Sequence, residues 1–149
     1  MQALALPVWT PVPLPADMPP VWLQAAHVSV AAGFPSPAED HQVERIELMS
    51  QLVRHPQATF YVRIAGDSMR DAGILDGSVV LVDKAIKPRH GHIVIAVVDG
   101  EFTCKRLHLS GTRLRLKPEN PAFPVIEPKD GQTVEIWGVV VATIHQHIT

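Results

Sequence analysis

Residues 92–109 read HIVIAVVDGEFTCKRLHL, and this stretch indicates the fold class of the chain. Val, Ile and Phe are frequent in it, and these side chains favour β-strands. The pair Asp99-Gly100 between its two halves is a typical two-residue hairpin turn. The stretch therefore predicts two antiparallel strands, at residues 92–98 and 101–109.

Further runs of strand-forming residues surround this hairpin. They are rich in Val, Ile, Phe and Thr, and turns containing Gly, Asp or Ser separate them. The runs cover residues 59–65, 78–82, 113–118 and 134–144. Many short strands at close spacing predict a mainly β domain, either a small twisted antiparallel sheet or a partly closed barrel.

One helix is predicted ahead of these strands. The tetrapeptide Ser36-Pro37-Ala38-Glu39 matches a capping box with proline at the first helical position. Apolar side chains then recur on one helical face as far as Val53. The pair His55-Pro56 ends the pattern, because the residue before a proline resists helical geometry. We expect a helix over residues 37–54.

The N-terminal segment is predicted to be an extended arm. Eight of the 14 prolines lie within the first 37 residues. Proline fixes φ and lacks an N–H donor, so residues 7–20 can form neither a helix nor a central strand. The proline-free, apolar residues 21–32 suit an added strand. The expected organisation is an arm at residues 1–36 and a β-rich domain at residues 37–149.

The composition argues against several function classes. A 149-residue chain that is 46% hydrophobic can bury one core. Its net charge of −2 argues against a nucleic-acid binder held by charge, so we expect no direct DNA binding. The single cysteine, Cys104, can form neither an intramolecular disulfide nor a cysteine-rich zinc site, and we expect no metal or cofactor. The chain has no apolar run of about 18 residues, so we expect no membrane span and a cytoplasmic location.

Ser68 lies on a turn suited to acyl-transfer chemistry. The segment Gly66-Asp67-Ser68-Met69 follows a predicted strand, and the glycine permits a tight turn that exposes the Ser68 hydroxyl. Such a turn also aims successive backbone N–H groups outward, as an oxyanion hole requires. However, Ser68 and Asp71 fit equally well the start of a helix with an acidic partner. The turn alone leaves both interpretations open.

A nucleophilic serine needs a base, and histidine and lysine are the two options. The chain has eight histidines but no Gly-x-Ser-x-Gly motif, and no aspartate precedes a histidine by three positions, as in GDSL-type esterases. The pairs His90/His92 and His145/His147 are better explained as surface histidines than as metal ligands.

Lys105 is the other option. On an alternating strand it shares its face with Thr103 and Leu107, while Cys104 points to the opposite side and is expected in the core. Burial would lower the pKa of Lys105, and a neutral lysine can deprotonate a serine. A solvated lysine on the strand surface is the alternative interpretation.

Several segments together resemble a known family. From residue 32 onward the chain is similar to UmuD, the accessory subunit of a translesion polymerase, and through it to LexA-type self-cleaving peptidases. The segments that carry the resemblance are Gly33–Ala38, Gly66–Met69, His90–Ala96, Val98–Thr103 with Lys105, and Trp137–Val140. Residues before Ala32 match poorly.

The resemblance implies a fold and a set of site residues. The fold would be like that of the LexA C-terminal domain. Ser68 would be the nucleophile and Lys105 the general base, with the backbone N–H groups of Ser68 and Met69 forming the oxyanion hole. The bond cut would be Ala32–Gly33 in the chain's own arm.

The resemblance also implies partners. RecA filaments on single-stranded DNA would stimulate the cleavage during the SOS response. The shortened chain would be a homodimer that binds a UmuC-type polymerase subunit. Two alternatives remain at this point. One is a non-catalytic dimeric module that regulates a polymerase. The other is a LexA-type or phage-type repressor, which needs a DNA-binding head that the proline-rich arm cannot supply.

Overall fold

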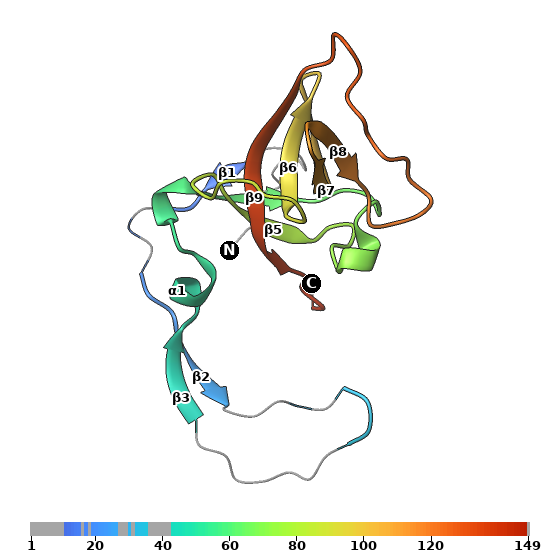
Figure 1. Ribbon diagram of the computed structural model, residues 1–149. Coiled ribbons are helices and arrows are strands. Elements are labelled where there is room, and N and C mark those ends of the chain that lie inside the picture. Colours follow the sequence, from blue (N-terminus) through green and yellow to red (C-terminus); the bar gives the residue numbers. More distant parts are fainter. Residues whose placement is uncertain are drawn as a thin grey trace.

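The computed structural model describes residues 11–15, 17, 19–26, 30, 32–35 and 43–148. A seven-stranded antiparallel sheet forms the body of this part of the chain (Figure 1). Its members are β1 (Val12–Pro13), β4 (Thr59–Arg63), β5 (Val79–Asp83), β6 (Ile93–Val98), β7 (Glu101–Ser110), β8 (Arg113–Lys117) and β9 (Val134–Ile144). All six strands predicted after Pro56 are therefore confirmed, as is the mainly β class.

The sheet is open rather than closed into a barrel. Its strand order is β1-β4-β5-β9-β6-β7-β8, and the two end strands, β1 and β8, do not pair with each other. Register shifts at Leu81/Val82 and at Ile95/Ala96 interrupt the pairing of β9 with its two neighbours. Irregularities of this kind bend and twist a sheet. The prediction allowed either a twisted sheet or a partly closed barrel, and the structure has the open, twisted sheet.

The β6–β7 hairpin turns as its sequence predicts. Val98 pairs with Glu101, which leaves Asp99 and Gly100 as the two turn residues. Their φ angles are +48° and +83°, as a type I′ turn requires. The hairpin places Lys105 in the middle of β7, next to Val94 of β6.

The predicted helix over residues 37–54 is wrong in most of its described length. Residues 43–47 form a strand, β3 (Val43–Glu47), and only α1 (Leu48–Leu52) is helical. The reason is that β3 pairs along its whole length with β2 (Trp22–Ala26). Tertiary pairing of this kind overrides local helical preference, and the periodicity of residues 37–54 does not reveal it. Helix α1 starts where the Glu47 carboxylate accepts hydrogen bonds from the N–H groups of Met49 and Ser50. The capping box at residues 36–39 lies outside the described residues.

The described part of the arm contains two strands, a turn at Asp17 and bends at residues 32–34. Pro13 lies in β1 at the edge of the large sheet, a position that tolerates a missing N–H donor. Strand β2 confirms the added strand expected within residues 21–32. The β2–β3 pair projects away from the large sheet, and the segment 32–35 lies at its far end (Figure 1). The proposed boundary at residues 36/37 lies outside the described residues.

Two clusters of buried apolar side chains cover β6 on both faces. Ile95 belongs to the first cluster, together with Val62 and Cys104. Its neighbours Val94 and Ala96 belong to the second cluster, because side chains alternate along a strand. Two short 3-10 helices, at Pro56–Ala58 and Arg70–Ala72, connect the strands. No helix in the described part of the chain is long and apolar enough to cross a membrane.

Candidate active site

Ser68 and Lys105 meet, although 37 positions separate them in the sequence. The Lys105 Nζ lies 3.1 Å from the Ser68 Oγ. Ser68 follows β4, and Lys105 lies within β7, two strands that are not neighbours in the sheet. The sequence offered Lys105 as one of two candidate bases, and the fold brings it to the serine.

The Ser68 hydroxyl does not cap a helix. The residue before the short helix Arg70–Ala72 is Met69, and that helix start has no side-chain hydrogen bond. The structural interpretation of Ser68 as a helix cap is therefore wrong. Other contacts hold the turn, among them the Gly66 N–H, which donates to the Asp76 carboxylate at 2.7 Å, and the Met69 side chain, which is almost fully buried.

Lys105 is buried, with only 8% of its surface exposed. Its Nζ contacts two further oxygens, the Thr103 Oγ1 at 2.8 Å and the Cys104 carbonyl at 3.1 Å. Burial lowers the pKa of Lys105 below its usual value, although the nearby Cys104 partly opposes this shift. The alternative of a solvated strand lysine is therefore wrong.

Cys104 lies in the core, as predicted. Its side chain packs in the first apolar cluster. Burial raises the pKa of the Cys104 thiol to about 12, and the charge of Lys105 opposes the rise. The thiol therefore stays protonated and poorly nucleophilic, because the thiolate is the reactive form.

Ser68 and Lys105 line a pocket of about 240 Å³. Its other walls come mainly from β4, from Ile64 just after that strand, and from β7, which contributes Phe102. The Phe102 ring packs edge-on against Trp137 at 5.9 Å. The Ser68 hydroxyl and the Lys105 amine thus lie in a pocket whose walls are largely apolar.

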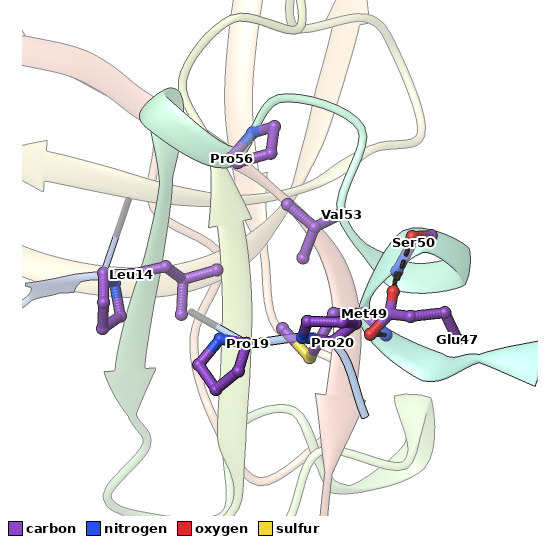
Figure 2. A pocket seen from close by; sticks show the side chains of 9 residues that line it. Leu14, Pro19, Pro20, Glu47, Met49, Ser50, Val53 and Pro56 are labelled. Atoms are coloured by element: carbon purple, nitrogen blue, oxygen red, sulfur yellow. Dashed lines mark hydrogen bonds between the residues drawn. The ribbon is translucent and has the colours of Figure 1, made fainter. Parts of the chain in front are cut away.

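A second pocket, of about 280 Å³, lies between the arm and α1 (Figure 2). Pro19, Pro20 and Pro56 line it together with Val53 and Met49, and Glu47 and Ser50 bond to each other at its side. It contains none of the predicted site residues. Its contact between the Ser50 hydroxyl and the Glu47 carboxylate belongs to the start of α1, where Glu47 also accepts the Met49 and Ser50 N–H groups.

The predicted cleavage site lies on the surface. Ala32 and Gly33 are exposed, and Gly33 has open space around it. The segment 32–35 is remote from the turn after β4 that carries Ser68 (Figure 1). The structure therefore brings Ser68 and Lys105 together but does not bring Ala32–Gly33 to them.

None of the histidines that the structure describes takes part in the Ser68 contact. His145 accepts or donates a hydrogen bond at Ser78, not Ser68, and His90 packs against His108. Among the described residues, no group of three or more His, Cys, Asp or Glu side chains has the arrangement of a metal site.

Three contacting residues were not singled out from the sequence. Thr103 contacts Lys105 because residues two apart in a strand share a face. The alternation of the sequence predicted this shared face. Glu119 and Asn120 contact the Ser68 turn from the segment after β8. Only tertiary structure brings these two next to Ser68.

Comparison with known proteins assigns the family. The Peptidase S24-like family matches residues 20–141, a range that contains Ser68 and Lys105. This chain is an S24 peptidase. It is 50% identical to protein SamA of Salmonella typhimurium strain LT2 over 115 residues, which are 77% of this chain and 79% of SamA.

Other relatives agree with this assignment. Protein MucA of Escherichia coli is 46% identical over 120 residues, or 79% of this chain and 81% of MucA. The LexA repressor of Paracidovorax citrulli is 37% identical over 115 residues, but these are only 51% of that repressor. The chain is thus a UmuD-type S24 peptidase, a self-cleaving serine peptidase of SOS mutagenesis.

Proposed function

We propose that Ser68 is the nucleophile and Lys105 the general base of this self-cleaving peptidase. The observation that supports this assignment is the 3.1 Å contact between Nζ and Oγ, made by a lysine that is only 8% exposed. A buried lysine loses the hydration of its ammonium form, so its neutral form is reached at a lower pH than for a lysine in solvent. A neutral amine beside a hydroxyl is the arrangement that nucleophilic catalysis requires.

The reaction then follows from the positions of these groups. Neutral Lys105 takes the Ser68 proton while Oγ attacks the carbonyl carbon of Ala32. The backbone N–H groups of Ser68 and Met69 stabilise the resulting oxyanion. Lys105 returns the proton to the departing nitrogen of Gly33, and water, deprotonated by the same lysine, hydrolyses the acyl-enzyme on Ser68.

The proposed substrate is the chain's own Ala32–Gly33 bond. Ala32 has a small side chain for a confined pocket, and Gly33 lets the peptide backbone approach closely. Because both residues lie far from Ser68 in the described conformation, cleavage requires the arm to move or a second chain to supply it (Figure 1). We propose that the cut removes residues 1–32, which are most of the arm, and leaves Gly33 as the new N-terminus of the remaining chain.

The proposed setting rests on membership of the UmuD-type family. RecA filaments on single-stranded DNA would stimulate the cut by favouring the cleavable conformation. The shortened chain would act in the cytoplasm as a homodimer and as the accessory subunit of a UmuC-type polymerase. A non-catalytic binding module on the same polymerase is the competing function, and it differs in needing no cleavage.

Incubation of the purified chain at alkaline pH tests the assignment. The wild-type chain should yield a fragment that begins at Gly33, identified by mass spectrometry. Ser68→Ala and Lys105→Ala should each abolish the fragment, because one removes the attacking oxygen and the other its base.

Two substitutions elsewhere provide matched controls. Ser110→Ala and Lys117→Ala make the same changes away from the Ser68–Lys105 contact and should leave cleavage at the wild-type rate. An uncut wild-type chain, with activated RecA present as well, would contradict the proposed function.

A further inference from the structure

The turn that carries Ser68 is held from outside by the segment Glu119–Asn120. The Glu119 N–H donates to the Ser68 carbonyl at 2.8 Å, and the Asp71 N–H donates to the Glu119 carbonyl at 2.8 Å. The Asn120 side-chain amide donates to the Asp67 carbonyl at 2.9 Å. Two successive carbonyls of the turn, those of Asp67 and Ser68, are therefore held by two successive residues of another segment.

These carbonyls belong to the same peptide groups as the proposed oxyanion donors. The Asp67 carbonyl shares a planar trans peptide with the Ser68 N–H, and the Ser68 carbonyl shares one with the Met69 N–H. In such a group the C=O and N–H bonds point in opposite directions. Fixing the two carbonyls therefore fixes the directions of both N–H groups.

The two N–H groups are left available. Within the part of the chain that the structure describes, no hydrogen bond has the Ser68 or Met69 N–H as its donor. An available, pre-oriented donor stabilises an oxyanion without the cost of reorganisation at the moment of reaction. The arrangement is the one that an oxyanion hole needs.

Asn120 and Glu119 are themselves well anchored. Asn120 is 6% exposed, and its Oδ1 accepts the Ala122 N–H at 3.0 Å. The Glu119 carboxylate pairs with Arg106, the residue after Lys105 on β7. The Arg106 guanidinium also donates to the Gly91 carbonyl at 2.7 Å. The segment thus joins the strand of the base to the turn of the nucleophile.

We infer that Asn120 is a positioning residue for the oxyanion hole, acting through the Asp67–Ser68 peptide. This inference rests on the proposed roles of Ser68 and Lys105. It assigns Asn120 no contact with the substrate and no part in proton transfer. Loss of its amide donor should lower the rate of cleavage without changing the protonation of Lys105.

Asn120→Asp is a sharp test because it is nearly isosteric. The carboxylate keeps an oxygen for the Ala122 N–H but cannot donate to the Asp67 carbonyl, so the peptide loses its side-chain restraint. The maximal rate of self-cleavage at high pH should fall, by less than the about 100- to 1,000-fold that removal of an oxyanion donor itself costs. The half-maximal pH is read from Asn120→Ala, which adds no charge near Lys105, and it should stay at the wild-type value because the contacts of Lys105 are intact.

Gln132→Glu is the matched control. Its amide donates to the Asp99 carboxylate at 2.9 Å, at the end of the β6–β7 hairpin. The substitution adds the same charge and removes the same kind of donor, so it should leave the cleavage rate unchanged. Asn120→Ala, which adds no charge, provides a second variant with the same expected loss of rate.

The outcomes separate this inference from the proposed function. If the wild-type chain does not cut, the proposed function fails. If it cuts and Asn120→Asp cuts equally fast, only the role of Asn120 fails. A shifted half-maximal pH in Asn120→Ala would overturn the inference, since Asn120 would then act on Lys105. Unfolding of both Asn120 variants, judged by thermal melts beside Gln132→Glu, would also overturn it and make Asn120 a residue of stability.

Discussion

Lys105 is surrounded by three oxygens that suit both of its protonation states. The charged ammonium can donate one hydrogen bond to each of Ser68, Thr103 and the Cys104 carbonyl. After loss of one proton, the two remaining N–H bonds can stay on Thr103 and Cys104. The lone pair then points at the Ser68 hydroxyl, which donates to it. The contacts with Thr103 and Cys104 thus hold the amine so that its lone pair faces the proton of the Ser68 hydroxyl.

The pH dependence of self-cleavage follows from the pKa of Lys105. Only the neutral amine accepts the Ser68 proton, so the rate should rise as pH increases through this pKa. Because burial lowers the pKa of Lys105 from 10.5, the half-maximal rate should lie below pH 10.5. Rates measured from neutral to strongly alkaline pH check this prediction, and a rate that is independent of pH would contradict it.

Thr103→Val should change both the half-maximal pH and the maximal rate of self-cleavage. Valine has nearly the shape of threonine but offers no oxygen to the ammonium group, so the charged form is destabilised and the half-maximal pH should fall. The neutral amine also loses one of its two anchors, so the maximal rate should fall about 10-fold. A Thr133→Val variant, remote from Lys105, serves as the control. An unchanged half-maximal pH in Thr103→Val would show that Thr103 does not stabilise the ammonium.

At the level of elements, a side chain of β5 occupies the space above a glycine of β9. Gly138 of β9 lies over Val82 of β5, and a Cβ built at Gly138 would be 2.6 Å from the Val82 Cγ1. Val82 is fully buried, so its side chain has no room to move aside. The missing side chain of Gly138 therefore makes room for the Val82 side chain.

Gly138→Ala should therefore destabilise the fold by about 1–3 kcal/mol, the usual cost of overpacking a core. Thermal or urea unfolding of a Ser68→Ala background, which stays uncut, measures this loss. Gly33→Ala is the matched control, because a Cβ there meets nothing within 4 Å. Equal stabilities for the two glycine variants would refute the account of the β5–β9 contact.

For the whole molecule, the sheet depends little on the arm. Of the seven strands, only β1 precedes Gly33, and it pairs with β4 through two residues. Both apolar clusters consist of residues from Val62 onward. The arm contributes an edge strand and the β2 half of a projecting hairpin, neither of which supplies core side chains.

A chain that begins at Gly33 should therefore fold by itself. It should keep the β-type circular dichroism spectrum and a single cooperative thermal transition, since the core is intact. Loss of the β2 partner should increase amide hydrogen exchange in residues 43–47 and leave exchange in β5, β6 and β9 protected. A non-cooperative melt of the shortened chain would contradict this view of the arm.

The sequence by itself determined the sheet and its hairpin. Alternation, β-branched residues and the Asp99-Gly100 turn are local signals, and they predicted every strand after Pro56. The same alternation placed Cys104 in the core and Lys105 beside Thr103. Sequence signals failed at residues 43–47, where pairing with β2 overrides a helical pattern, because periodicity within one segment carries no information about a distant partner.

Only the tertiary structure decided between the interpretations of Ser68 and Lys105. A serine on a tight turn is compatible with a helix cap, and a strand lysine with solvent exposure, as long as each is considered alone. Folding buries the lysine and sets it 3.1 Å from the serine. It also brings Glu119 and Asn120 to the carbonyls of the turn. Both arrangements depend on contacts between segments far apart in the chain, and burial and orientation are properties of such contacts.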